Sequence, residues 1–401
     1  MPVLKYILLL ILSISLIPVF GQKLLNKREQ SEKIILPGAY LPGKYQPLLK
    51  GKRTGIVANH TSMINRTHLV DSLVESGINI VKIFGPEHGF RGDQPDGKEI
   101  GNAKDPKTGI EVISLYGNHK KPTNADLKNI DIMLFDIQDV GVRFYTYIST
   151  LAYVMEACAE NNIPLVVLDR PNPNGYYIDG PVLDTNFTSF VGLHPVPVVY
   201  GMTIGEYATM VNGEKWLKSR KQCELTIIKC ENYTHNSRYQ LPVRPSPNLK
   251  DMNAIYLYPS LCFFEGTVVS VGRGTDVPFR IYGHPLYSPG SYSFTPKPIK
   301  GISDDPPLKG QKCYGKDLTE ASEILKNEGK LELVWLIETY KVLSPKTQYF
   351  VKYFDKLAGN SSLREQIIAG KSESEIRSSW QTNLEKFKES RRKYLLYLDF
   401  E

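Results

Sequence analysis

Carboxylates suited to acid–base chemistry stand directly after apolar runs of the sequence. Glu87 follows one such run in Gly85-Pro-Glu-His-Gly89, and Asp136 and Asp139 follow another. A carboxylic acid in a partly desolvated cleft has its pKa raised and can protonate a leaving group, while a second carboxylate can act as base or nucleophile. The sequence therefore predicts Glu87 as a general acid, with Asp136 and Asp139 as candidate partners.

Each of these carboxylates also has a purely structural interpretation. Glu87 could accept hydrogen bonds from nearby backbone amides. Asp136 or Asp139 could cap the helix expected near Tyr147, or pair with Arg143. The residues alone leave both interpretations open.

Other polar side chains occupy equivalent positions, at the ends of four apolar runs. They are Asn59, His60, His88, Gln138, Asp169, Arg170 and Asn172. In open parallel sheets, ligands bind outside the carboxyl ends of the strands, so these side chains are expected to face one site. Loop residues can also be polar simply because they face water. Four coincident polar ends favour a site.

Aromatic residues lie close to these loops in the sequence. Tyr116, Phe144, Tyr145 and Tyr147 could form a wall on which a sugar ring stacks. Aromatic side chains are more often part of a hydrophobic core, so this observation is weak support.

A metal centre and a nucleotide cofactor have little support. His60, His88, Asp136 and Asp139 could together bind zinc or manganese, but no H-E-x-x-H or comparable local spacing accompanies them. Neither G-x-G-x-x-G nor a P-loop motif follows the first strand, and the glycines of Gly272-Arg-Gly-Thr275 could equally form a tight turn. We expect no metal and no cofactor.

Strand and helix patterns alternate in the first half of the chain and must position these residues. Mostly apolar runs predict strands at 54–58, 78–84, 130–137 and 164–168, and amphipathic patterns predict helices at 68–75 and 148–161. Runs without alternation are typical of strands covered on both faces. Thr203-Ile-Gly-Glu206 is a capping box ahead of a helix at 207–217. The pattern indicates an α/β domain with an open parallel sheet.

A second domain is expected after the Pro-rich passage at 241–248. The 401 residues exceed what one hydrophobic core usually serves, and we place the boundary near Val243. This gives domains at 33–243 and 244–401. The second domain is predicted to be α+β, with strands at 254–261 and 267–271 and helices at 318–327, 331–343 and 372–397.

Composition and the N-terminal segment limit the class of protein. The chain is 41% hydrophobic and 23% charged, with a formal net charge of +7, which is typical of a globular protein and does not indicate nucleic-acid binding. Lys5, an apolar run at 6–20 and Gly21 have the order of a secretory signal. We expect residues 1–21 to be cleaved and the protein to be secreted or periplasmic, without stable membrane insertion. An uncleaved anchor is the alternative.

The five cysteines do not predict a disulfide. Their odd number leaves at least one unpaired, and an extended segment between Cys223 and Cys230 would hold those two too far apart to bond.

Several long motifs resemble one known family. They are Phe84-Gly-Pro-Glu-His-Gly-Phe-Arg-Gly92, Asp105-Pro-Lys-Thr-Gly109, Phe135-Asp-Ile-Gln-Asp-Val-Gly-Val-Arg-Phe-Tyr-Thr-Tyr147, Leu168-Asp-Arg-Pro-Asn-Pro173, Arg244-Pro-Ser-Pro-Asn248 and Tyr258-Pro-Ser-Leu-Cys-Phe-Phe-Glu-Gly-Thr267, followed by Gly272-Arg-Gly-Thr275. In this order they resemble the DUF1343 family, whose characterised members are exo-β-N-acetylmuramidases of the NamZ type. The resemblance covers nearly the whole chain after the N-terminal segment.

The resemblance implies a fold and an activity. The fold is a Rossmann-like N-terminal domain with a smaller C-terminal domain and an active cleft between them. The activity is release of N-acetylmuramic acid from the non-reducing ends of peptidoglycan fragments, including disaccharides that contain this sugar. Glu87 matches the family's proposed catalytic glutamate. Asp136 or Asp139, or the substrate's own N-acetyl group, would supply the second catalytic function.

Substrate contacts are expected from the motif residues. A bidentate arginine suits the lactyl carboxylate of the sugar, and Arg91, Arg143 and Arg273 are the candidates. The loop from Glu265 to Thr275 would close the pocket. The full set of expected contacts is Asn59, His60, His88, Arg91, Gln138, Arg143, Tyr145, Asp169, Arg170, Asn172, Asn248, Glu265, Arg273 and Thr275.

Two other functions share these motifs. A cell-wall binding protein could hold muropeptides without cleaving them, and a metal-dependent hydrolase or deacetylase could use His60, His88 and Asp136. Only the first alternative dispenses with a correctly placed acid.

Overall fold

A seven-stranded sheet organises the N-terminal half of the computed structural model, which describes residues 33–87, 89–91 and 103–401. The predicted signal at 1–21 and His88 lie outside the described residues. The strand order is β5-β6-β4-β1-β7-β8-β9, and only β5 and β6 pair antiparallel. The strands are β1 Thr54–Ala58, β4 Ile80–Gly85, β5 Ala103–Lys104, β6 Glu111–Ser114, β7 Ile132–Asp136, β8 Leu165–Leu168 and β9 Leu225–Ile228.

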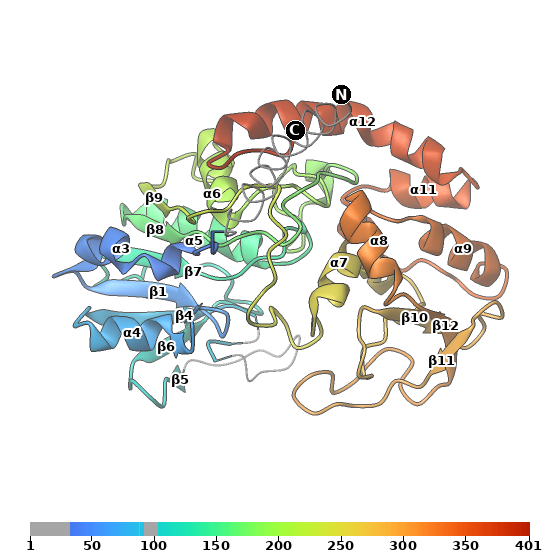
Figure 1. Ribbon diagram of the computed structural model, residues 1–401, viewed down its shortest axis with the longest axis horizontal. Coiled ribbons are helices and arrows are strands. Elements are labelled where there is room, and N and C mark those ends of the chain that lie inside the picture. The colour runs from blue at the N-terminus through green and yellow to red at the C-terminus, as the bar shows by residue number, and fades with distance from the viewer. Residues whose placement is uncertain (1–32, 88, 92–102) are drawn as a thin grey trace, which may run out of the picture.

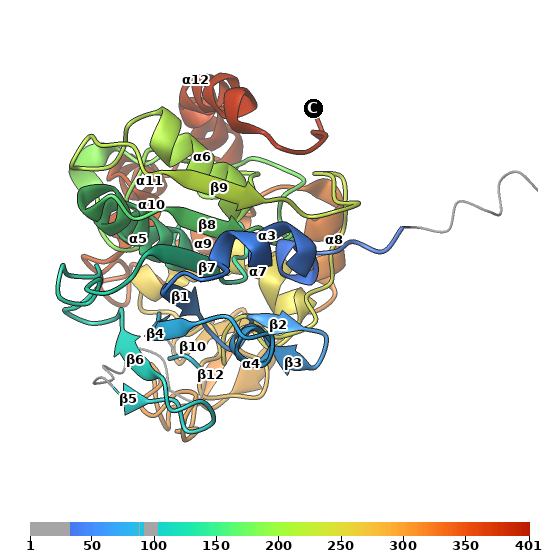
Figure 2. The ribbon, with the colours of Figure 1, turned by 90° about the vertical axis from the view of Figure 1, so that its left-hand side faces the viewer.

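Helices cover both faces of this sheet. Figure 2 shows α5 (Tyr147–Asn161) and α6 (Ile204–Gly213) on one side, and α3 (Pro42–Leu49) and α4 (Leu69–Glu75) on the other. Alternate residues of a strand pack against the helices on opposite faces of the sheet. In β1, Val57 belongs to the hydrophobic core beneath α5 and Ile56 to the core beneath α4. Short elements complete this half: η1 Gly38–Tyr40, η2 Thr185–Phe187 and a hairpin of β2 Met63–Ile64 and β3 Thr67–His68.

The predicted α/β organisation is confirmed. The run at 54–58 is β1 without change, and the other three predicted strands correspond to β4, β7 and β8 with slightly shifted ends. The capping box is present in full, with Thr203 accepting from the Glu206 amide and Glu206 accepting from the Thr203 amide. It starts α6 at Ile204, three residues earlier than predicted.

The C-terminal half is a smaller α+β unit. Its elements are α7 Met252–Leu261, η3 Cys262–Gly266, β10 Ile281–His284, β11 Tyr292–Phe294, β12 Cys313–Asp317, α8 Ala321–Glu328, α9 Val334–Leu343, α10 Phe354–Ala358, α11 Ser362–Ile368, α12 Glu373–Arg391 and η4 Arg392–Tyr394. Strands β10, β12 and β11 form an antiparallel sheet, which Figure 1 shows at the far end from the parallel sheet.

Two predicted strands in this half are wrong. Residues 254–261 belong to α7, which Asp251 caps by accepting from the Ala254 amide. Every residue from Ala254 to Leu261 is buried, so the segment has no amphipathic pattern and its apolar run resembles a strand. Residues 267–271 form only isolated bridges.

The last helix and the tail return to the N-terminal domain. Figure 1 shows α12 running from α11 toward α6. The hydroxyl of Tyr397 donates to Asp169, and the amide of Leu396 donates to Glu206, which α6 carries. Arg391 is fully buried and pairs with Asp399. The chain therefore crosses between the two domains twice.

Two further features concern the cysteines and the lengths of the helices. All five cysteines are buried and unbonded. Within the described ranges, no helix combines the length and the apolar character needed to span a bilayer.

Candidate active site

Glu87 lies in the turn that follows β4 and contributes to two adjoining cavities. The hydroxyl of Thr146 donates to its Oε2 at 3.1 Å. Thr146 precedes α5 as its N-cap residue, yet its side chain makes no capping hydrogen bond. The hydroxyl that usually caps a helix in this position instead orients the carboxylate.

The larger cavity has a volume of about 410 Å³ and walls from both domains. The N-terminal domain contributes Glu87, Tyr116, Lys120, Phe144, Thr146, Ser189, Phe190 and Val191, and the C-terminal domain contributes Tyr258, Glu265, Arg273, Tyr353 and Lys356. A cleft between the domains can thus admit a ligand of the size of one sugar with its substituents.

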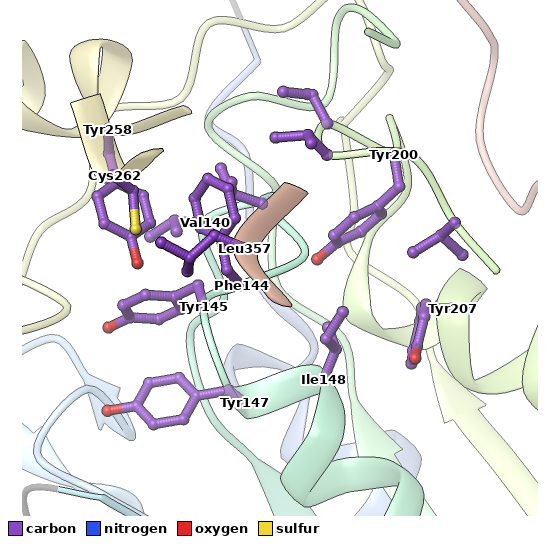
Figure 3. Close-up of a cluster of buried hydrophobic side chains, with 14 of the residues drawn as sticks. Val140, Phe144, Tyr145, Tyr147, Ile148, Tyr200, Tyr207, Tyr258, Cys262 and Leu357 are labelled. Carbon is purple, nitrogen blue, oxygen red and sulfur yellow. The ribbon is translucent and has the colours of Figure 1, made fainter. Parts of the chain in front are cut away.

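The smaller cavity, of about 90 Å³, is lined by tyrosines. Figure 3 shows Tyr145 and Tyr147 with their hydroxyl groups on the same side and Tyr258 beside them. The rings of Tyr145 and Tyr147 contact edge to face, with 4.9 Å between their centroids. The Tyr145 hydroxyl donates to the carbonyl of Pro245. The aromatic residues considered from the sequence border these cavities, but Phe144, Tyr145 and Tyr147 are buried and belong to the hydrophobic core.

Glu265 is the second carboxylate of the larger cavity. The Nε of Arg273 lies 2.6 Å from its Oε1, and the guanidinium stacks on the ring of Phe279. The loop predicted to close the pocket thus contributes one carboxylate and one cation to it. Thr275, at the end of this loop, bonds its hydroxyl to the carbonyl of Gly272.

Asp136 has a different environment. It is fully buried and accepts two hydrogen bonds from the guanidinium of Arg170, at 2.6 and 2.8 Å. Asp136 therefore neither caps α5 nor pairs with Arg143, and it does not line either cavity. Its pairing with Arg170 joins the ends of β7 and β8.

Asp139 is also buried away from the two cavities. Its Oδ2 accepts hydrogen bonds from the hydroxyl of Tyr200 and the amide of Gly141. Burial raises the pKa of Asp139 to about 6, although these hydrogen bonds oppose the shift. The carboxyl end of β7 thus holds two buried carboxyl groups in different environments: Asp136 is paired with a guanidinium, and Asp139 has a pKa raised by burial.

The raised pKa of Asp139 predicts a pH dependence of stability. An ordinary aspartate in the unfolded chain ionises near pH 4, so between about pH 4 and 6 the folded state binds more protons and is destabilised as the pH rises. The Asp139→Asn variant removes this effect. We expect its free energy of unfolding, relative to wild type, to rise by about 2–3 kcal/mol from pH 4 to pH 6.

Urea unfolding at several pH values measures this difference. Asp105→Asn is the matched control: burial raises the pKa of Asp105, but hydrogen bonds from Arg91 and Thr108 outweigh it and lower the pKa. The stability from a lowered pKa is nearly all present above the unfolded value near pH 4, so the difference between this variant and wild type should change far less than that of Asp139→Asn between pH 4 and 6. If the free energy of unfolding changed with pH in the same way in both variants, the pH dependence could not be assigned to Asp139.

Two of the three arginines predicted for a lactyl carboxylate are engaged elsewhere. Arg91 pairs with Asp71 and Asp105. Arg143 is fully buried and donates to four backbone carbonyls, those of Pro181, Val196, Leu357 and Ala358. Only Arg273 of the three lines a cavity.

The remaining predicted residues hold the edge of the sheet together. Four of them are buried, and their side chains are hydrogen-bonded: Gln138, Asp169 and Asn172 to neighbouring loops, and Asn59 to Tyr147 of α5. The ring of His60 contacts the carbonyl of Arg244, and the side-chain amide of Asn248 donates to the carbonyl of Ile302. Of the predicted set, Glu87, Tyr145, Glu265 and Arg273 come together at the cleft.

Two residues of the metal site considered from the sequence lie beside other partners. His60 lies beside Arg244, Asp136 beside Arg170, and His88 is outside the described residues. In the part of the chain that the structure describes, no three His, Cys, Asp or Glu side chains are grouped to hold a metal ion.

Comparison with known families agrees with the motifs. A model described as exo-β-N-acetylmuramidase NamZ, N-terminal, matches residues 54–253, and its C-terminal counterpart matches residues 256–397. The chain belongs to the NamZ family. The predicted resemblance and the enzyme class are therefore confirmed.

Relatives of this NamZ-family chain share its sequence and its fold. Peptidoglycan β-N-acetylmuramidase NamZ of Bacillus subtilis (strain 168) is 41% identical over 383 residues, which cover 88% of this chain and 89% of that protein. A crystal structure of a DUF1343 family protein from Bacteroides fragilis has 46% identity and a TM-score of 0.85, covering 91% of this chain and 99% of that one. A second such structure from the same organism has 30% identity and a TM-score of 0.74, and the match covers 90% of this chain and 99% of that one.

Several residues that line the cleft were not predicted. Thr146 lies inside the motif that ends at Tyr147, and its place in this motif is the one sequence feature that points to a role at the site. Lys120 and Lys356 stand in segments without a motif, and Tyr353 precedes a short helix. No local pattern identifies them, because their proximity arises from the packing of the two domains.

Proposed function

We propose that this NamZ-family protein is an exo-β-N-acetylmuramidase that releases N-acetylmuramic acid from the non-reducing ends of peptidoglycan fragments. The observation that carries the proposal is the position of Glu87, in a cavity with walls from both domains and with Thr146 holding one carboxylate oxygen. The substrates we propose are muropeptides and disaccharides that carry this sugar.

Glu87 acts in this proposal as the general acid. Its proton passes to the glycosidic oxygen while positive charge develops on the sugar ring, as in an oxocarbenium-like transition state. The Thr146 hydroxyl fixes Oε2, so that the proton is delivered from a carboxyl group of defined orientation.

The second catalytic function belongs to a group at the same cavity. Glu265 is the carboxylate that shares the cavity with Glu87, whereas Asp136 is paired with Arg170 and Asp139 is buried. We therefore favour Glu265, or the substrate's own N-acetyl group, over the two aspartates. Either route places the reaction between the two domain walls.

Sugar release tests the proposal directly. We expect the wild-type protein to liberate N-acetylmuramic acid from a disaccharide with this sugar at its non-reducing end, and to leave internal bonds of long glycan chains intact. The same rate in EDTA separates this activity from a metal-dependent hydrolase or deacetylase. Binding of the disaccharide without any sugar release would instead support the binding-protein alternative.

The compartment in which the protein acts is a further part of the proposal. Lys5 followed by the apolar run at 6–20 supports a secretory signal, which would bring the enzyme to peptidoglycan outside the cytoplasm. N-terminal sequencing of the protein recovered from its native host tests this, with a new terminus after Gly21 as the expected result.

A further inference from the structure

Among the described residues, the larger cavity carries more positive than negative charge once its internal ion pair is set aside. Its charged side chains are Glu87, Glu265, Lys120, Arg273 and Lys356. Arg273 and Glu265 neutralise each other at 2.6 Å. Neither lysine forms an ion pair with any described residue, so both line the cavity without a counter-charge, and Glu87 is the remaining carboxylate.

Lys120 is held in place by an aromatic stack. Its Nζ lies 4.9 Å from the centre of the Phe190 ring, and that ring stacks on Tyr153 of α5 at 6.2 Å with an angle of 12°. The next residue, Lys121, turns to α5 instead and pairs with Glu160 at 2.7 Å. The two adjacent lysines thus have different surroundings: Lys121 binds a helix of its own domain, and Lys120 lines the cavity.

Lys356 is held through its helix. It lies in α10, whose carbonyls at Leu357 and Ala358 accept hydrogen bonds from Arg143 of the N-terminal domain. The buried guanidinium therefore fixes the position of α10, and with it the backbone of the exposed Lys356, relative to the wall that carries Lys120. The two cations approach the cavity from opposite domains.

We propose that Lys120 and Lys356 bind the carboxylate that distinguishes N-acetylmuramic acid from N-acetylglucosamine. This inference rests on the proposed function and replaces the arginine clamp expected from the sequence. The anion is the lactyl carboxylate in the unsubstituted sugar, or the nearest carboxylate of the stem peptide in a muropeptide. Two ammonium groups from opposite walls would select a charged substituent and orient the sugar relative to Glu87.

Kinetics with paired substrates test the two lysines. The variants are Lys120→Met, Lys356→Met and the double variant, and the controls are Lys121→Met and Lys352→Met, which remove lysines outside the cavity. The substrates are one glycoside of N-acetylmuramic acid, its lactyl methyl ester, and the same sugar bearing an alanyl-glutamate dipeptide. Each is made with the same leaving group.

For the free lactyl substrate we expect KM to rise about tenfold in each single variant and about a hundredfold in the double variant, with kcat changed less than threefold. The ester should show no such change, and the controls should match wild type on all substrates. An effect confined to the dipeptide substrate would support carboxylate binding and identify the stem peptide as its source. Equal changes for charged and ester substrates would overturn the proposal.

Failure of the proposed function gives a different result. If wild type cleaves none of the glycosides, the glycosidase proposal fails, and calorimetric binding of N-acetylmuramic acid against N-acetylglucosamine then tests the lysines separately. Preference of wild type for the acidic sugar, lost in the double variant, supports the lysine site. Equal binding of both sugars by wild type overturns it.

Discussion

Glu87→Gln is expected to lower kcat on a disaccharide substrate by a factor of about 10²–10⁴. The amide is isosteric with the carboxyl group and can still accept the hydrogen bond from Thr146, but it cannot donate a proton to the glycosidic oxygen. A phenolic leaving group with several electron-withdrawing substituents needs little protonation. We therefore expect the loss to be much smaller on such an activated aryl glycoside than on the disaccharide.

Glu265→Gln is the matched control for this experiment, because it removes the other carboxylate of the same cavity. Its effect should be similar for both leaving groups, since neither a base nor a positioning role involves protonation of the leaving oxygen. If the dependence on the leaving group follows Glu265 and not Glu87, the acid has been assigned to the wrong residue. Near-normal turnover of the disaccharide by Glu87→Gln would falsify the acid assignment altogether.

Arg143→Leu is expected to lower the free energy of unfolding by about 4 kcal/mol. The guanidinium donates to four carbonyls, two on each side of the domain boundary, at 2.8–2.9 Å. Each buried carbonyl left without a partner costs about 1 kcal/mol or more. Burial lowers the pKa of Arg143, so the variant also removes the cost of burying a charged guanidinium. We therefore expect a net loss of only about 1 kcal/mol for each carbonyl.

Urea unfolding of Arg143→Leu and Arg364→Leu checks this prediction. Arg364 forms a partly exposed pair with Asp355, on the same helix α10 that Arg143 contacts. Its removal should cost less than about 1 kcal/mol. Similar stabilities for the two variants would show that the four carbonyls find other partners, and that Arg143 does not join the domains.

The sequence predicts most of the parallel sheet because its strands are buried on both faces. An apolar run such as that of β1 has one stable placement in an α/β domain, and the capping box at Thr203 marks a helix start in the same local way. The run that forms α7 shows the limit of this reasoning. A segment that is buried on every side is apolar throughout, whether it forms a helix or a strand. The helix cap at Asp251 is the signal that distinguishes the two for α7.

The candidate site is predictable in part for a related reason. Polar strand ends are expected at a ligand site, and Glu87 agrees with that expectation. At the ends of β7 and β8, however, Asp136 and Asp169 bind Arg170 and Thr203, so the same polarity serves contacts between loops. A sequence does not reveal whether a strand end faces a cavity or another loop. That depends on how the second domain packs.

The return of the tail to the N-terminal domain has a consequence for synthesis of the protein. Asp169 and Glu206 lie near the middle of the chain, but Tyr397 and Leu396 supply hydrogen bonds to them. These partners emerge from the ribosome after the rest of the C-terminal domain. Until the whole C-terminal domain has been made, these two carboxylates keep only the hydrogen bonds of their own domain, such as those from Thr203.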